Sequence, residues 1–237
     1  MKIRFFLVGL LLTFCAFSFA QETVTYGYGY GYGYDEEYGS EPNSSIWTDW
    51  FVQLGVGGQT FLGDFSKFNG VISRATLMPS FAVGKWWSPY WGTRLQFQGG
   101  ALHNFPTNDF MQKDTYSNLH LDVMCNLLEY FDQYEFGVFS FIPYAGLGTY
   151  WRGKVSDDNN LLEKRGYISY PEAHAGVTIH AGALFQFRLN DAISCHLDVA
   201  GTLLTDDYLN RWTGGVSCEG VFSVSAGLTL NLGEIFP

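Results

Sequence analysis

The chain has 237 residues, of which 15% are charged and 18% aromatic, with 28 glycines, 7 prolines and a formal net charge of −10. Average soluble domains carry about 25% charged residues, so this chain is poor in the charges that a water-facing surface needs. The acidic excess argues against nucleic acid and anionic membrane surfaces as charge-driven partners, because both attract basic faces. Beyond the N-terminal region no stretch reaches the roughly 18 apolar residues of a membrane helix, which argues against a helical membrane protein.

Residues 1–20 have the pattern of a secretory signal peptide. Lys2 and Arg4 make a basic start, residues 5–17 form an apolar core, and the small residues Ser18 and Ala20 stand at positions −3 and −1 of the cleavage site. We expect cleavage after Ala20, which leaves 11 basic against 23 acidic residues and a net charge of −12. The protein is therefore expected to be exported.

Residues 21–46 have a different composition from the rest of the chain. Tyrosine and glycine alternate from Tyr26 to Tyr34, an acidic run follows, and no aliphatic pattern is available for burial. Such a segment is predicted to be a disordered periplasmic leader. Two interpretations stay open: an unstructured tether, or an arm (residues 26–38) that contacts an envelope or host protein.

From Trp47 onward, apolar and polar residues alternate with a period of two, which indicates β-strands and not helices. Each such segment is long enough to cross a membrane as a tilted strand. The eight predicted strands are 49–62, 76–87, 91–102, 115–127, 136–151, 172–187, 192–204 and 215–232.

The connections between these strands alternate in length. The short ones are 88–90, 128–135 and 188–191, and the long ones are 63–75, 103–114, 152–171 and 205–214. Short turns on one side and long loops on the other are typical of outer-membrane barrels. With an even number of strands, both chain ends lie on the short-turn side, which we expect to face the periplasm. The longest loop, 152–171, is a second candidate contact for envelope or host proteins.

The tryptophans lie at or just beyond the ends of the predicted strands. An indole has an apolar body and a polar N–H, so tryptophans gather at the two interfaces of a bilayer. We therefore predict an aromatic girdle of Trp50, Trp86, Trp87, Trp91, Trp151 and Trp212.

Three parts of the alternating region have a familiar sequence pattern. They are residues 83–86 with 92–94 across a turn, residues 118–126, and residues 143–148. These segments resemble the OmpA-type eight-stranded outer-membrane β-barrel domain family of Gram-negative bacteria. The resemblance implies an all-β fold, an eight-stranded antiparallel transmembrane barrel over residues 47–237, embedded in outer-membrane lipid. Many relatives continue into a peptidoglycan-binding domain, and because the chain stops at Pro237 we expect none here.

The lumen of an eight-stranded barrel is just wide enough for side chains to fill it. A buried charge needs a partner, so we expect Arg94 to pair with Asp122 on the adjacent strand and with Asp198 across the lumen. This predicts a lumen plugged by polar side chains. By parity the central inward-facing residues are Arg94, Gln96, His120, Asp122, His196 and Asp198, accompanied by Gln98, Asn118, Asn126, Tyr144, Tyr150, His174, His180, Gln186 and Ser194.

Two kinds of chemistry compete with a purely structural interior. Four inward histidines and the two aspartates could supply metal ligands, but the histidines lie at different heights, so we expect no metal and no other cofactor. Ser194, His196 and Asp198 are the residue types of a hydrolytic site. By parity they point into the lumen and away from lipid, so we expect no enzyme.

The pattern favours a non-catalytic integral outer-membrane protein with a structural and interaction role, in envelope integrity and surface-loop adhesion. Three alternatives stay open: a small porin-like channel, an accessory subunit of a secretion or surface-assembly complex that uses the leader, and a lipid A-modifying barrel enzyme. A soluble ligand-binding barrel would reverse the two faces, with its apolar side chains inside.

Overall fold

The computed structural model describes residues 47–63, 74–107, 110–131, 138–153, 168–169, 173–205, 212–213 and 219–236. The predicted signal peptide and leader (residues 1–46) lie outside the described residues. Of the predicted loop 152–171, only residues 152–153 and 168–169 are described.

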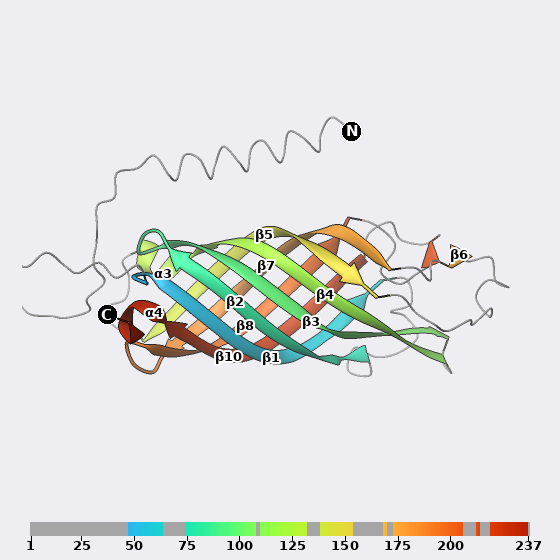
Figure 1. The fold of residues 1–237 in the computed structure, drawn as a ribbon, viewed down its shortest axis with the longest axis horizontal. Coiled ribbons are helices and arrows are strands. Elements are labelled where there is room, and N and C mark those ends of the chain that lie inside the picture. Colours follow the sequence, from blue (N-terminus) through green and yellow to red (C-terminus); the bar gives the residue numbers. More distant parts are fainter. Residues whose placement is uncertain are drawn as a thin grey trace, which may run out of the picture. The chain divides into compact units, whose positions relative to one another are not determined.

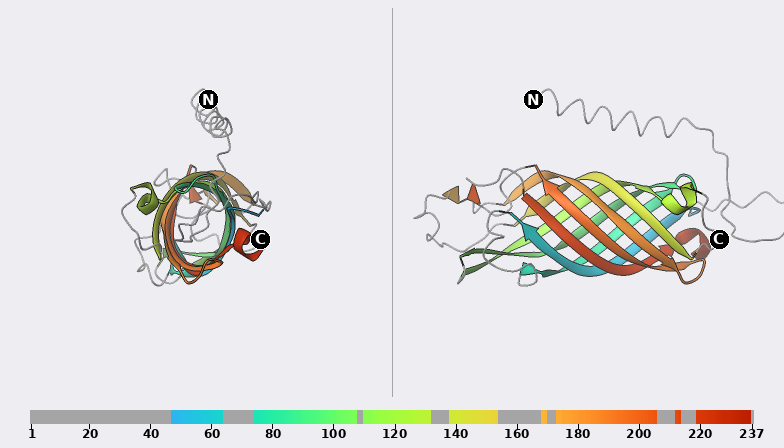
Figure 2. Two further views of the ribbon diagram at one scale, coloured as in Figure 1. Left: turned by 90° about the vertical axis from the view of Figure 1, so that its left-hand side faces the viewer. Right: turned by 180° about the vertical axis from the view of Figure 1, so that it is seen from behind.

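Eight strands form a closed barrel (Figures 1 and 2). They are β1 (Trp50–Leu62), β2 (Thr76–Trp86), β3 (Trp91–Thr107), β4 (Phe110–Cys125), β5 (Phe139–Arg152), β7 (His174–Arg188), β8 (Ile193–Leu204) and β10 (Glu219–Asn231). Each strand pairs antiparallel with its neighbours, and β10 pairs with β1 to close the ring. The predicted eight-stranded antiparallel barrel is confirmed.

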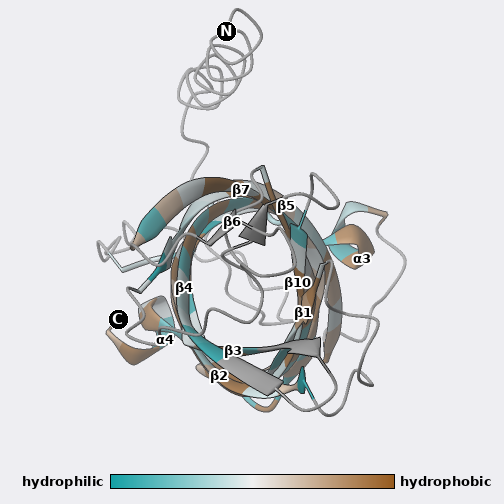
Figure 3. Cartoon of the chain, turned by 90° about the vertical axis from the view of Figure 1, so that its right-hand side faces the viewer, coloured by the Kyte–Doolittle hydropathy of each residue, from teal (hydrophilic) through white to brown (hydrophobic). Residues whose placement is uncertain are grey.

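The two faces of the sheet differ in polarity, as strand alternation requires. In β8, Ser194, His196 and Asp198 are buried inside the barrel, whereas Leu197 and Leu203 are exposed on the outside. In Figure 3 hydrophobic and hydrophilic residues alternate along the strands, and large hydrophobic residues of other strands, such as Leu54, Leu95 and Leu121, are likewise exposed on the outside. The outer face is therefore the apolar one, which is the arrangement of a barrel in lipid and not of a barrel in water.

No helix among the described residues has the length and apolarity to cross a membrane.

The two ends of the barrel carry different connections (Figure 1). At one end lie the short β2–β3 and β7–β8 turns and two helices, α3 (Leu127–Tyr130) and α4 (Leu232–Ile235). We call this the short-turn end. At the opposite, long-loop end a separate two-stranded sheet forms from β6 (Ile168–Ser169) and β9 (Trp212–Thr213).

One predicted connection is wrong. Residues 103–114 were expected to be a loop, but β3 and β4 continue as a paired hairpin as far as Thr107 and Phe110, with a register shift between Asn104 and Thr107. Continued pairing satisfies the backbone N–H and C=O groups whether or not the side chains still alternate. The elements α3, α4, β6 and β9 were also not predicted, because segments of two to four residues are too short to show a period.

Candidate functional site

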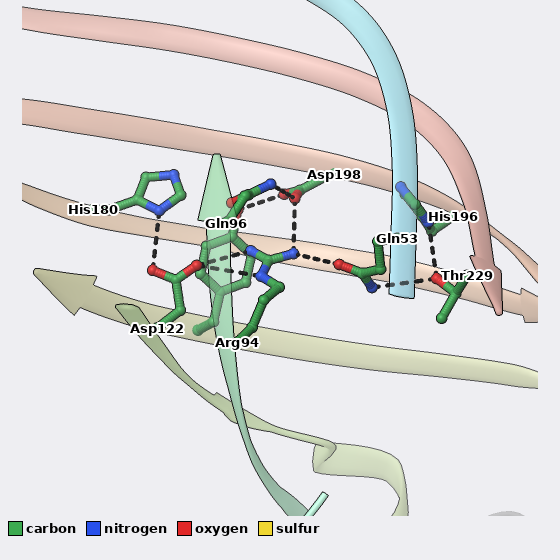
Figure 4. Close-up of polar contacts among 9 residues, drawn as sticks. Gln53, Arg94, Gln96, Asp122, His180, His196, Asp198 and Thr229 are labelled. Atoms are coloured by element: carbon green, nitrogen blue, oxygen red, sulfur yellow. Dashed lines mark hydrogen bonds and ion pairs between the residues drawn. The ribbon is translucent and has the colours of Figure 1, made fainter. Parts of the chain in front are cut away.

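Arg94 is the centre of a polar network inside the barrel (Figure 4). Its Nε and Nη2 donate to Oδ2 of Asp122 at 3.3 and 3.1 Å. Its Nη1 donates to Oδ2 of Asp198 at 3.2 Å and to Oε1 of Gln53 at 3.0 Å. The side chains of Arg94, Asp122 and Asp198 are 1%, 0% and 3% exposed. The guanidinium is thus surrounded by two carboxylates and an amide, which compensate the loss of water.

Strand register explains the first of these contacts and barrel closure explains the second. Arg94 and Asp122 are directly opposite each other on the neighbouring strands β3 and β4. Asp198 belongs to β8, which is not a neighbour of β3 in the ring. The Arg94–Asp198 contact therefore spans the lumen and joins residues 104 positions apart in the sequence.

Asp198 accepts two further hydrogen bonds, from residues of β3 and β5. Gln96 donates from Nε2 to Oδ2 of Asp198 at 3.3 Å, and the hydroxyl of Tyr144 donates to Oδ1 at 2.5 Å. The guanidinium carbon of Arg94 lies 4.2 Å from the centroid of the Tyr144 ring. Charge, hydrogen bonds and a cation–π contact therefore hold one compact group together.

Two buried histidines extend the network on the Asp122 side. Nδ1 of His180 lies 3.1 Å from Oδ1 of Asp122. The ring of His120 stacks on that of His180 with centroids 4.0 Å apart and planes 20° apart. Among the described residues neither buried ring nitrogen of His120 has a hydrogen-bond partner, and the contact that joins His120 to the group is the stacking of its ring on His180.

His196 is connected indirectly. Its Nδ1 lies 3.0 Å from Oγ1 of Thr229, which also accepts a hydrogen bond from Nε2 of Gln53 at 3.2 Å. Gln53 in turn accepts from Arg94, so Thr229 and Gln53 link His196 to the centre (Figure 4). The structure therefore brings Arg94, Gln96, Asp122 and Asp198 into one directly bonded group, whereas His120 joins it through His180, and His196 through Thr229 and Gln53.

Two observations bear on metal binding and on nucleophilic chemistry in the lumen. Within the described part of the chain, no group of three or more His, Cys, Asp or Glu side chains is arranged to hold a metal ion. Ser194 is buried on the inner face, and Nδ1 of His196 contacts Thr229. The network joins β1, β3, β4, β5, β7, β8 and β10 through side-chain contacts in the lumen.

Comparisons with known proteins agree with this architecture. No protein-family model matches the chain. It is 30% identical over 187 residues to outer membrane protein 40 of Porphyromonas gingivalis, an alignment that covers 78% of this chain and 47% of that one. It is 36% identical over 106 residues to outer membrane protein 41 of the same organism, covering 43% and 27%. The chain thus spans about half the length of the first relative and less of the second.

The crystal structure of Neisserial surface protein A has the same fold. It superposes with a TM-score of 0.53 at 6% identity and covers 78% of this chain and 97% of that one. The chain is an eight-stranded outer-membrane β-barrel protein.

Most tryptophans of this outer-membrane barrel lie on its outer rim. Trp50, Trp87 and Trp91 are at the short-turn end and Trp151 is next to the last residue of β5 at the long-loop end. Trp87, Trp91 and Trp151 are among the exposed large hydrophobic residues. The backbone of Trp212 lies in β9, and its side chain is not described.

Trp86 departs from the predicted girdle. It is partly buried and packs against the apolar cluster inside the barrel, with its ring centroid 6.0 Å from that of Phe51. The reason is strand parity, since Trp86 shares the inward face of β2 with Ala82 and Gly84. The position of Trp86 at a strand end predicted its level along the barrel axis, but it did not predict whether the side chain faces the lumen or the outside.

Sequence reasoning missed two polar members of the interior and most of its apolar part, of which it named only Tyr144 and Tyr150. Gln53 and Thr229 share the inward parity of β1 and β10, so extending the alternation to those strands would have found them. Two clusters of apolar side chains also fill the barrel. They are Phe51, Met124, Ile142, Tyr144, Leu184 and Ala200 in one cluster and Phe61, Leu102, Tyr116, Tyr150, Leu204 and Val221 in the other.

Proposed function

We propose that this protein has a structural role in the outer membrane, as a non-catalytic barrel with a plugged lumen. It supports the integrity of the envelope, and its loops contact envelope or host surfaces. The observation that carries this proposal is the contact of Arg94 with both Asp122 and Asp198, because it fastens opposite walls of the barrel to each other through the lumen.

The lumen contents support a plug over a pore. An eight-stranded barrel leaves room for side chains and little else, and the wide aqueous channels belong to larger barrels. Here a buried ion network occupies the interior together with two clusters of buried apolar side chains. An ion that crossed would have to displace Arg94 from its carboxylates.

The role is passive in physical terms. The outward apolar side chains bury in hydrocarbon, and the tryptophans of the rim set the depth of the barrel in the bilayer. The interior network rigidifies the wall, since each strand that it touches is fixed to others by hydrogen bonds to charged groups. Burial of Ser194 on the inner face supports the absence of a lipid-modifying reaction, because the acyl chains of a substrate lie outside.

Export and external contacts complete the proposal. The basic start and apolar core of residues 1–20 support export with cleavage after Ala20. Residues 26–38 and the loop 152–171 are the proposed contacts for protein partners. Deleting each segment separately and measuring which co-purifying envelope proteins disappear tests these assignments.

Conductance in planar bilayers tests the plug. The full-length protein is expected to give no stepwise ion current. The triple variant Arg94→Ser, Asp122→Ser, Asp198→Ser removes the three charged side chains of the Arg94 network and is expected to conduct in small steps. Stepwise current from the unmodified protein would contradict the plug and favour a channel.

A further inference from the structure

The outward face of the strands, where its side chains are described, carries almost no charge. Among the outward-facing strand residues whose side chains are described, only Lys85 and Lys113 are charged. Lys85 is the next-to-last residue of β2, at the short-turn end, and Lys113 lies near the start of β4, at the long-loop end. A lysine on the lipid face of a barrel is costly at the bilayer midplane and tolerated near the interfaces, so both positions are interfacial.

The ammonium of Lys85 lies between two tryptophan rings. Its Nζ is 5.8 Å from the ring centroid of Trp50, its cross-strand partner on β1, and 5.0 Å from that of Trp87. The indole N–H of Trp87 donates to Oγ1 of Thr93 at 2.9 Å, and Thr93 is the partner of Lys85 on β3. Three adjacent strands therefore hold one cation at the rim of the lipid face.

The hydrogen-bond donors of Lys85 remain available. A cation–π contact is an attraction between the positive charge and the ring face. It does not use the three N–H groups of the ammonium as donors to an oxygen atom. Within the described part of the chain, Nζ of Lys85 makes no hydrogen bond or ion pair. Asp49 interacts with it electrostatically, yet burial raises the pKa of Asp49 and Lys85 only partly opposes this shift.

We propose that Lys85, Trp50 and Trp87 form a binding site for the phosphate of a phospholipid headgroup. This assignment rests on the proposed outer-membrane function and on the expected orientation, with the short-turn end toward the periplasm, so the lipid belongs to the periplasmic leaflet. The ammonium donates to the phosphate oxygens, and the indoles lie at the level of the headgroups. Val52 and Val83, the next outward residues toward the middle of the barrel, then border the acyl chains.

Native mass spectrometry of the full chain, folded in detergent micelles, tests this site. Phosphatidylglycerol is titrated in, and the controls are lipid A and a phosphate-free galactolipid with matched acyl chains. Lys85→Gln is expected to weaken phosphatidylglycerol binding about fivefold, the effect of one basic residue at a membrane surface. Lys85→Arg retains binding, and Lys113→Gln, the matched variant at the opposite end, behaves as the unmodified protein.

Three outcomes would overturn the proposal: equal binding by Lys85→Gln and the unmodified protein, an equal loss with Lys113→Gln, or galactolipid binding that depends equally on Lys85. Tighter Lys85-dependent binding of lipid A than of phosphatidylglycerol would overturn the assignment to phospholipid. An unboiled gel band that shifts on heating shows that each variant is folded. Stepwise current from the same samples would refute the plugged lumen and leave the lipid site standing, so the two proposals fail separately.

Discussion

At the scale of single residues, Arg94 is the side chain on which most of the interior depends. Two carboxylates from β4 and β8 and an amide from β1 surround its guanidinium, and all are shielded from solvent. A buried ion pair contributes little net stability compared with apolar residues of the same shape. Removing one partner, however, strongly destabilises the folded state, because the other charge stays buried without compensation. The effect of a substitution therefore depends on whether it leaves a charge without a partner.

Replacing Arg94 with methionine is expected to lower the free energy of unfolding by about 3–5 kcal/mol, because Asp122 and Asp198 remain buried and uncompensated. The matched control is the triple variant Arg94→Met, Asp122→Asn, Asp198→Asn, which removes all three charges and is expected to recover most of the loss. Urea unfolding in lipid vesicles, followed by tryptophan fluorescence, measures both. Equal stability of the single variant and the unmodified protein would mean that the ion network does not stabilise the barrel.

Asp49, just before β1, provides a pH-dependent test outside the membrane. Its φ of 67° lies in the left-handed region, which asparagine also tolerates. Burial raises the pKa of Asp49 above the ordinary 3.8, so the folded state binds the proton more tightly than the unfolded state does. Proton binding by the Asp49 carboxyl therefore stabilises the folded state at low pH, and this contribution is lost as the pH rises through the raised pKa.

Asp49→Asn is accordingly expected to be slightly more stable than the unmodified protein at neutral pH. The advantage should disappear below the ordinary pKa of 3.8, where the carboxyl is protonated in both states. Unfolding midpoints in urea, measured from pH 3 to pH 8, provide the comparison. A stability difference that does not change with pH would rule out the carboxyl as its origin.

At the scale of elements, the seam between β1 and β10 closes the barrel and leaves no space for a side chain at Gly227. Gly227 pairs with Gly55. A Cβ on Gly227 would lie 2.0 Å from the carbonyl oxygen of Leu54 and 2.7 Å from Cα of Gly55. Backbone atoms cannot give way as a flexible side chain can, so even a methyl group must push the two strands apart.

Gly227→Ala is expected to destabilise the closed barrel by about 1–3 kcal/mol, the usual cost of overpacking. Gly201→Ala is the matched control, since a Cβ on Gly201 meets nothing within 4 Å on the outer face of β8. Samples of each variant are heated to increasing temperatures before the gel is run. The temperature at which the band of the folded barrel is replaced by that of the unfolded chain measures the difference in stability between the two variants. Equal conversion temperatures for the two variants would show that the seam can relax.

The strands show which parts of an element a local pattern can predict. The eight strands appear where the alternation places them, and their ends differ by a few residues except in the β3–β4 hairpin, which continues as far as Thr107 and Phe110. There, pairing with the other strand and not the alternation of side chains sets the length. Parity likewise predicted the inward orientation of Arg94 and Asp198, whereas the position of a tryptophan at a strand end did not predict the inward turn of Trp86.

At the scale of the whole molecule, closure of the hydrogen-bonded ring makes the barrel resistant to detergent. Because β10 pairs with β1, unfolding cannot begin by peeling an edge strand. In the outer-membrane fraction of cells, the unboiled protein is expected to migrate at a different position from the boiled one on a denaturing gel. A band in the soluble fraction that does not shift on heating would contradict both the membrane location and the closed barrel.

The amino-acid sequence by itself determined the all-β character, the number of strands and the polar face of each one, because alternation with a period of two is local information. The pairing of Arg94 with Asp122 and Asp198 was expected from the need to neutralise a buried charge, whereas only the tertiary structure decided the links through Gln53, Thr229 and Tyr144. The contact of Arg94 with Asp198 joins positions 104 residues apart on strands that are not neighbours. It depends on register and on the curvature of the closed sheet, and these arise from all eight strands together.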